Sequence, residues 1–475
     1  MRNKKVVEIN NFNNFDSNSN EIKTKLFYNF LPTTQLTNTH GIAVATFPLN
    51  YKNKNEKELN ISATGISSVQ GVSYFKQYFP QNDKTKHRLL VYGNDKKIYI
   101  NQMLDDTYDL IWLYDLEFNS APITLSFKKD DTDTIILASS DEMKIWQTNY
   151  SPYTIENVPI ITSMCMNEGV LFCTIKEPAF KVWYATDLKP ENVGHISRNS
   201  GYISLEDDLG YARKIITFNE EVYVFRDYGI SKINFVKDEK MVSQVYLSNT
   251  KIYTNTVCVC GNSVLFMTKD GVYSFNGIKV NKTKIEFINS LPVENNGAVA
   301  STLGEKYYLA LKVNFEDQKQ ILCEESEFVN NALVIVDTKD FSYEIIRGVD
   351  VQSFLPLKTE VFEKMLITFN SGPIDKIGQI VEVAKYMSEN LPKFWSSDSL
   401  FDTVNTKLVT KLSVKANKNI KFTLKYDNKE ISFVTYKDGV NDFMFKLCCK
   451  DMKIEISSSD ESSIVKNVFL DYYEY

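Results

Sequence analysis

The chain has 475 residues, of which 43% are hydrophobic and 13% aromatic, a supply of apolar side chains large enough for an extensive core. The formal net charge of -6 gives no reason to expect a surface that coats nucleic acid. No stretch approaches 18 uninterrupted apolar residues, and no apolar run follows the basic residues of the first segment. We therefore expect neither a membrane-spanning helix nor a signal peptide.

Residues 1–60 are polar and irregular, and only 6–9 and 43–47 have a strand-like pattern. Such a segment is either disordered or an extended arm that is ordered by neighbours. We expect deletion of residues 1–40 to leave the later repeats folded but to prevent assembly. The few apolar side chains of this arm are the expected anchors on a partner surface: Val6, Val7, Ile9, Phe12, Phe15, Leu26, Phe27, Phe30 and Leu31.

Residues 215–277 contain two consecutive copies of one unit, each read as a strand, a turn, an apolar strand, a polar corner and a third strand. The second strands, 222–225 and 264–267, are apolar with little alternation, as expected when a strand is covered on both faces. The corners supply the Gly and Asp that tight hairpins require. The step from Val222 to Val264 is 42 residues, the length of one four-stranded propeller blade.

Similar units extend over residues 61–390. Their most apolar strands begin near residues 89, 135, 170, 222, 264, 307 and 365. We therefore predict an all-β chain with a β-propeller, for which seven blades are preferred and six are possible. The last blade of a ring must be closed, commonly by a strand from the other end of the domain, and residues 60–66 are the candidate.

The repeat spacing ends at residues 391–402. Beyond it the strands are short, and turn signals recur every 8–12 residues. This pattern predicts a C-terminal antiparallel β-sandwich over residues 391–475. The predicted order of domains is an extended arm (1–60), a propeller (61–390) and the sandwich.

The seven cysteines are odd in number, and most lie inside strand patterns. This usage favours reduced, buried thiols made in a cytoplasm over a disulfide framework. Cys448 and Cys449 are adjacent in a strand and point to opposite faces, so we expect no redox pair there. Cys258 and Cys260 do not easily meet disulfide geometry within one strand. Titration of the denatured, unreduced protein should find close to seven free thiols.

Residues suited to metal binding are scarce. His40, His87 and His195 have no partner at metal-ligand spacing, and each is interpreted as a surface or turn residue. The acidic run at 130–133 lacks the Gly and the distant Glu of a calcium loop, so a hairpin turn is favoured. We expect no metal and no cofactor.

Two groups of carboxylates, at 206–208 and 324–325, resemble the acid and base of glycosidases. Both lie in polar loops, and their separation in space cannot be deduced from the sequence. The sequence contains no phosphate-binding glycine loop and no serine nucleophile elbow. We therefore predict that the chain is not an enzyme. Some loop aromatic residues are candidate interface anchors instead: Tyr150, Tyr153, Phe394 and Trp395.

Three segments together resemble one family. Residues 6–44 (VVEINNFNNF to THGIAV) resemble the arm that begins many bacteriophage virion propeller proteins. Residues 180–193 (FKVWYATDLKPENV) resemble their blade signature, in which an aromatic strand precedes a small residue, an Asp-containing turn and Pro-x-x-Trp or Val. Residues 394–475 resemble their closing sandwich. The family includes the tail-hub, or packaged-DNA-stabilising, proteins of short-tailed phages.

This resemblance implies a structural virion component, made in the host bacterial cytoplasm, that forms a homo-oligomeric ring at the head–tail junction or tail hub and continues the DNA channel. Its partners would be other copies of itself, a portal or adaptor, the tail tube or fibres, and DNA that passes without sequence-specific binding. No membrane is expected. The residues expected to mediate assembly are Val6, Val7, Ile9, Phe12, Phe15, Phe27, Phe30, Phe394 and Trp395.

Two alternatives remain open at this point. The chain could be a tail or surface module that binds a host glycan on one propeller face. It could also be a propeller glycoside hydrolase that uses Asp207 or Asp208.

Overall fold

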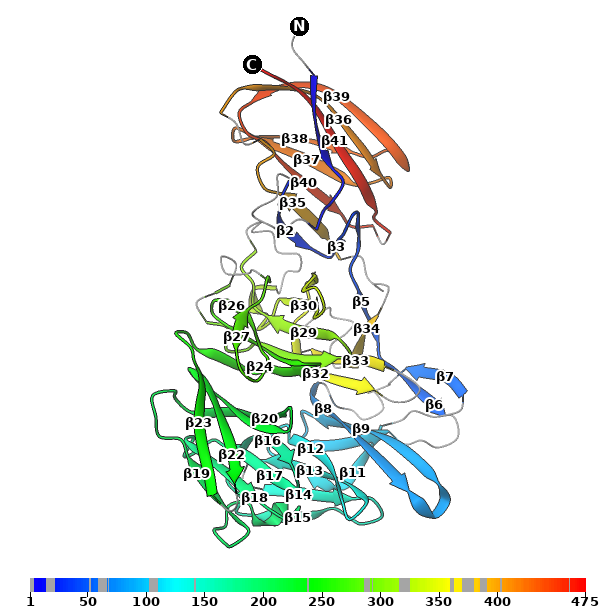
Figure 1. Ribbon diagram of the computed structural model, residues 1–475. Helices are drawn as coiled ribbons and strands as arrows, with labels where there is room; N and C mark the ends of the chain where they lie inside the picture. Colours follow the sequence, from blue (N-terminus) through cyan, green and yellow to red (C-terminus); the bar gives the residue numbers. More distant parts are fainter. Residues whose placement is uncertain are drawn as a thin grey trace.

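The computed structural model describes residues 4–13, 22–50, 53–58, 66, 68–101, 110–140, 142–236, 239–285, 291–292, 294–315, 325–358, 363–369, 380–384, 391–401, 404–460 and 462–475. It contains two β-sheet bodies, a propeller and a sandwich, which are drawn at opposite ends of the molecule in Figure 1. The predicted all-β fold is confirmed.

Within these ranges, seven four-stranded antiparallel sheets form the blades of the propeller. Blade 1 comprises β8 (Val69–Phe79), β9 (Lys84–Gly93), β10 (Lys97–Asn101) and β11 (Leu110–Glu117). Blade 2 comprises β12 (Ile123–Lys129), β13 (Thr132–Ser139), β14 (Glu142–Gln147) and β15 (Tyr153–Glu156). Blade 3 comprises β16 (Ile161–Asn167), β17 (Val170–Ile175), β18 (Lys181–Ala185) and β19 (Ser200–Ser204).

Blade 4 comprises β20 (Ala212–Phe218), β21 (Glu221–Arg226), β22 (Gly229–Val236) and β23 (Glu239–Leu247). Blade 5 comprises β24 (Ile252–Cys260), β25 (Ser263–Thr268), β26 (Gly271–Phe275) and β27 (Val280–Lys282). Blade 6 comprises β28 (Val299–Leu303), β29 (Lys306–Leu311), β30 (Ala332–Asp337) and β31 (Tyr343–Arg347). Blade 7 comprises β32 (Val351–Lys358), β33 (Glu363–Phe369), β34 (Ile380–Ala384) and β5 (Gly41–Val44).

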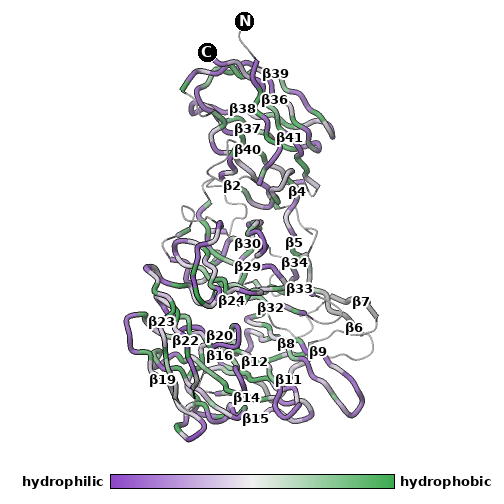
Figure 2. Tube along the Cα trace, viewed as in Figure 1, coloured by the Kyte–Doolittle hydropathy of each residue, from purple (hydrophilic) through white to green (hydrophobic). Residues whose placement is uncertain are grey.

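The second strands of the blades are covered on both faces, as their sequences predict. In β25, Val264, Leu265, Phe266 and Met267 are all fully buried. Phe266 also meets Phe225 of blade 4, with ring centroids 5.5 Å apart. Contacts of this kind fill the spaces between neighbouring blades with distinct clusters of buried apolar side chains. Figure 2 shows the contrast with the hydrophilic tip of the β8–β9 hairpin.

The strand that closes the ring differs from the prediction. Residues 41–44 (β5) pair antiparallel with β34 and complete blade 7, whose first strand β32 contacts β8 of blade 1. The predicted closing strand was 60–66, of which 60–65 lie outside the described residues. Residues 41–44 close the ring because the chain reaches the edge of β34 as soon as it leaves the sandwich. A hairpin of β6 (Thr46–Asn50) and β7 (Asn53–Glu58) follows before blade 1 begins.

The sandwich contains two antiparallel sheets. One comprises β3 (Phe30–Pro32), β4 (Leu36–Asn38), β41 (Val465–Glu474), β36 (Lys407–Ala416) and β39 (Gly439–Cys449), with β1 (Lys4–Ile9) also paired to β41. The other comprises β2 (Thr24–Tyr28), β35 (Lys393–Ser397), β40 (Lys453–Ser458), β37 (Lys421–Tyr426) and β38 (Lys429–Val434).

The N-terminal segment therefore belongs to the two bodies and is not a separate arm. Strands β1 to β4 lie in the sandwich, where β1 is drawn beside β41 in Figure 1, and β5 lies in the propeller. Among the residues that the structure describes, there is therefore no boundary between an arm and the propeller at residue 60. The described part of the N-terminal segment is divided between the sandwich (β1 to β4) and the propeller (β5). The chain passes from sandwich to propeller, around the ring, and back to the sandwich.

The described residues include short 3₁₀ helices at η2 (Pro80–Asn82), η3 (Pro190–Asn192) and η5 (Glu325–Glu327). In this described part of the chain, no helix has the length and apolar character needed to span a membrane.

Candidate functional site

The contact between sandwich and propeller, which we call the junction, is built around Asn29. Asn29 is fully buried and has a left-handed backbone (φ 57°), a conformation that Asn tolerates better than most residues. Its N–H donates to the Ile345 carbonyl (2.7 Å), and its Oδ1 accepts from the N–H of Arg347 (2.9 Å). Its Nδ2 donates to the Pro392 carbonyl (2.8 Å). One side chain thus connects the N-terminal segment, blade 6 and the start of the sandwich.

A buried ion pair lies beside Asn29. Arg347 donates from Nε to Oε1 of Glu325 (2.7 Å) and from a terminal nitrogen to Oε2 (3.1 Å), and both side chains are 5% exposed. The guanidinium lies over the rings of Tyr28 (4.7 Å) and Phe315 (4.1 Å). Bidentate pairing with a carboxylate and stacking on aromatic rings both stabilise an arginine side chain and fix its orientation.

A second polar contact joins the same segments. The N–H of His40 donates to Oε2 of Glu344 (2.8 Å), and Nδ1 of His40 also contacts that carboxylate. His40 follows β4 and precedes β5, so the contact fixes the chain where it crosses from sandwich to propeller. The interpretation of His40 as a plain surface or turn residue is therefore corrected.

The other histidines do not form a site either. His87 lies buried in β9, contrary to its interpretation as a surface residue, with its ring stacked on Tyr74 at 5.9 Å. His195 is exposed. Among the residues that the structure describes, no group of three or more His, Cys, Asp or Glu side chains could hold a metal ion.

Most of the expected assembly residues are core residues of the chain's own sandwich. Ring centroids of Phe12 and Trp395 are 5.2 Å apart, and Trp395 Nε1 donates to Thr24 Oγ1 (3.1 Å). Phe394 is half-buried and stacks on Tyr28 at 5.5 Å. The residues that are buried are Ile9, Phe12, Phe27, Phe30 and Trp395.

The buried residues are thus unavailable to a neighbouring chain in this fold, which corrects their interpretation as anchors. Val6 is 53% exposed and Val7 is half-buried, and Phe15 lies outside the described residues. In blade 2, Tyr150 before β15 and Tyr153 at the start of β15 are exposed. Among the described side chains that the sequence suggested, Val6, Tyr150 and Tyr153 are exposed to a partner.

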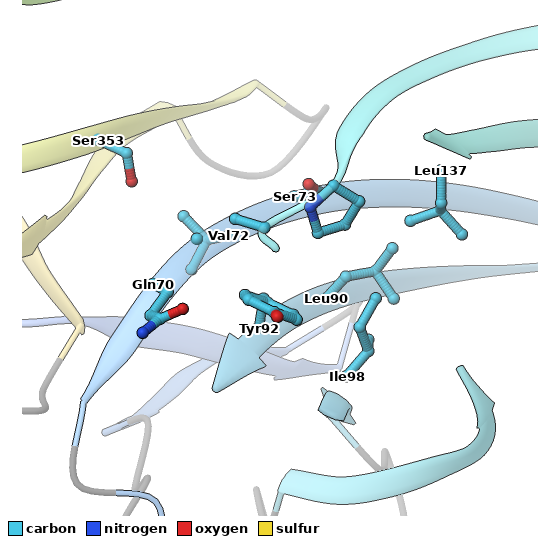
Figure 3. Close-up of a pocket in the computed structure, with 11 residues that line it drawn as sticks. Gln70, Val72, Ser73, Leu90, Tyr92, Ile98, Leu137 and Ser353 are labelled. Atoms are coloured by element: carbon cyan, nitrogen blue, oxygen red, sulfur yellow. The ribbon is translucent and has the colours of Figure 1, made fainter. Parts of the chain in front are cut away.

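A cavity of about 180 Å³ lies where blades 1, 2 and 7 meet (Figure 3). The hydroxyl groups of Tyr92 and Ser353 in its wall already form hydrogen bonds within the propeller. Tyr92 donates to the Phe118 carbonyl (2.8 Å), and the hydroxyls of Ser353 and Thr368 are 2.6 Å apart. The described residues of the wall include no carboxylate, lysine, histidine or cysteine. This cavity has room for a few water molecules and lacks the acid and base that glycoside hydrolysis needs.

Two of the carboxylates considered for hydrolysis, Asp207 and Glu325, are held by arginines. Asp207 pairs with the fully buried Arg226, which also donates to the carbonyls of Leu205 (2.7 Å) and Gly210 (2.9 Å). Glu325 pairs with Arg347 at the junction. Asp208 is exposed in the same loop as Asp207, and Glu324 lies outside the described residues. Asp207 and Glu325 therefore stabilise local structure.

The six cysteines that the structure describes are free thiols: Cys165, Cys173, Cys258, Cys260, Cys448 and Cys449. Cys448 is exposed and Cys449 is buried, which confirms that these neighbours point to opposite faces. Burial raises the pKa of Cys165 to about 12 and that of Cys258 to about 12. A thiol whose charged form is disfavoured in this way is a poor nucleophile.

These pKa shifts predict that stability falls in alkaline solution. An unfolded thiol has a pKa near 9.0, so above that pH the unfolded state releases protons that the folded state retains. The melting temperature should decrease from pH 9 to pH 11. Thermal melts over this range should show a shallower decrease for the Cys165→Ala/Cys258→Ala double variant. Equal slopes for the variant and the natural chain would contradict the assignment.

Comparisons with known proteins found no matching protein-family model and no similar curated protein. Solved structures with a similar fold include the extracellular domain of the hybrid two-component system protein BT4673 from B. thetaiotaomicron (TM-score 0.45, 11% identity, 90% of this chain and 59% of that chain). Others are the N-terminal domain of Nup159 (TM-score 0.41, 9% identity, 77% and 98%) and BBS1N in complex with ARL6 (TM-score 0.40, 11% identity, 68% and 94%). These likenesses concern the propeller fold alone.

Proposed function

We propose that the chain is a structural component of a bacteriophage virion, or of a phage-derived particle, that acts in a homo-oligomeric ring at the head–tail junction or tail hub. The observation that carries this proposal is the junction. Within one chain, Asn29 and the pair Arg347–Glu325 hold the propeller and the sandwich together. A mechanical force on one body is therefore transmitted to the other. The resemblance of three segments to phage virion propeller proteins supports the same role.

The electrostatics fit a particle through which DNA moves. Each phosphate neutralised by a lysine or arginine adds salt-dependent affinity, so a channel that releases DNA should not bind phosphate tightly. The net charge of -6 agrees with this requirement. The expected partners are other copies of the chain, a portal or adaptor, and the tail tube or fibres.

Electron microscopy of particles that contain the full chain tests this proposal. We expect closed rings in which each subunit contributes a propeller and a sandwich at different heights. The ring should persist when Lys84, exposed in the propeller, is changed to Asp, whereas disruption of the junction by Asn29→Ala should reduce the yield of rings. Particles in which the chain occupies no ring would contradict the proposal.

A second candidate is a glycan-binding module, which is favoured by the exposed rings of Tyr150 and Tyr153. Exposed aromatic faces are suited to recognition by stacking. Glycan binding by a monomer, lost in the Tyr150→Ala/Tyr153→Ala variant, would support this candidate over the ring.

A further inference from the structure

The two sheets of the sandwich end side by side. Among the described strands, β38 ends one sheet and β39 ends the other. The ring of Phe433 in β38 lies 4.9 Å from that of Phe443 and 5.1 Å from that of Phe445, both in β39. All three rings are half-buried. This side of the sandwich thus presents two strand edges with an apolar layer between them.

Strand β39 is long for an edge strand, and its outer face exposes two apolar side chains, Val440 and Met444. It has eleven residues and pairs with β36 on one side only among the described strands. Met444 and Val440 are 74% and 55% exposed. Long, exposed edges of this kind invite pairing with another strand, and proteins usually protect them with charged side chains, Pro or bulges. The pairing of β39 with β36 has an irregularity of this kind between Met444 and Leu447.

Two charged side chains of opposite sign lie on either side of Met444 in β39. Asp442 stands two residues before Met444 and Lys446 two residues after it, and both are exposed. In an antiparallel pair of two identical strands centred on Met444, residues at equal distances on either side of the centre lie opposite each other. Asp442 of each copy would then face Lys446 of the other. Opposite charges at directly opposed positions stabilise a strand pair, whereas like charges there would destabilise it.

Other features of β39 agree with the same register. Phe443 of one copy lies opposite Phe445 of the other on the inner face, so the apolar layer would continue from one sandwich into the next. Ser413 Oγ lies 2.7 Å and Lys411 Nζ 3.1 Å from Oδ1 of Asp442, and these contacts hold the carboxylate in place. Its position is therefore set before a second strand arrives, which lowers the entropic cost of pairing.

We propose that two copies of this chain associate through antiparallel pairing of β39 with β39 about a two-fold axis at Met444, so that the sheets of two sandwiches become one. This is an isologous contact, in which each copy contributes the same surface. The inference goes beyond the proposed virion role. A two-fold contact joins subunits in pairs and does not close a ring, so any ring must use a different surface.

A charge exchange tests the register with the full chain. Light scattering coupled to gel filtration should show that the natural protein approaches twice the 54.7 kDa chain mass as its concentration rises. Lys446→Asp places two carboxylates opposite each other at both ends and should weaken association at least tenfold. Asp442→Lys/Lys446→Asp restores opposite charges and should recover the dimer. Lys84→Asp, a matched charge reversal in the propeller, should leave association unchanged.

Cysteine cross-linking provides an independent test. In the proposed register Val440 lies opposite Cys448 of the second copy, whereas within one strand these residues are eight positions, roughly 26 Å, apart. Mild oxidation of Val440→Cys should therefore produce a covalent dimer, and Val440→Cys/Cys448→Ser should not. Unchanged melting curves would show that the variants fold.

A monomer at all concentrations, or a dimer that neither responds to Lys446→Asp nor cross-links in Val440→Cys, would overturn the inference. The proposed ring is judged separately by electron microscopy. Rings that persist in Lys446→Asp would leave the virion role standing whatever the outcome for β39.

Discussion

Deletion of residues 1–40 is expected to unfold the sandwich. The deletion removes strands β1 to β4, and β2 is the partner of β35 at the edge of its sheet. Five buried apolar side chains leave with these strands: Ile9, Phe12, Phe27, Phe30 and Leu36. Burying one such side chain contributes about 1.5–3 kcal/mol, so their loss amounts to on the order of 10 kcal/mol. A typical domain has a total stability of about 5–15 kcal/mol.

Limited proteolysis and thermal melting of two truncated chains would measure this effect. Removal of residues 1–9 takes away only β1 and should lower the melting temperature of the sandwich while the fold persists. Removal of residues 1–40 should make residues 391–475 sensitive to protease. The propeller should resist longer, because β5 remains to close blade 7. A fully protected sandwich in the longer deletion would contradict the topology and restore the interpretation of a separate arm.

Arg347→Met is expected to destabilise the protein by about 3–5 kcal/mol, because it removes the guanidinium from the buried carboxylate of Glu325. The substitution also removes the cation that lies over the rings of Tyr28 and Phe315. Chemical denaturation followed by circular dichroism would measure the change.

The double variant Arg347→Met/Glu325→Leu is the control for this prediction. Because it removes both charges and supplies apolar side chains of similar size, it should recover much of the lost stability. Lys339→Met, in the exposed pair with Glu305, should leave the stability unchanged, because solvent screens a pair of this kind. An Arg347→Met variant as stable as the natural chain would show that the junction does not depend on this pair.

The propeller could be predicted because its signals are local. Each blade pairs strands that follow one another in sequence, so an apolar strand, a tight turn and the next strand lie within one 42-residue unit such as that from Val222 to Val264. The strands that the sequence predicted to be covered on both faces are buried in the structure. The weakest unit, blade 7, is the one that takes its last strand from elsewhere.

The N-terminal strands could not be predicted in the same way. β2 pairs with β35 and β5 pairs with β34, more than 300 residues along the chain, and such distant pairing has no local pattern. The polar composition of residues 1–60 favoured an arm. The short apolar run at the end of Thr24–Tyr28 (TKLFY) was the available signal of a strand.

The junction was also hidden from the sequence. The carboxylate of Glu325 and the guanidinium of Arg347 come together only when blade 6 folds, and Asn29 reaches them from the other end of the chain. A lone Asn before Phe30 gives no indication that it will bind three segments. Glu325 was instead considered as a catalytic carboxylate, because the sequence does not show that Arg347 is its partner.

Quantitative mass spectrometry of purified particles tests the central claim, a structural role in the virion, most directly. We predict that the chain is present in intact, nuclease-treated particles at a fixed number of several copies per genome, and that it remains with tails or connectors when the heads are opened. Its absence from particles that are complete and infectious, or a variable amount that washing removes, would contradict the account.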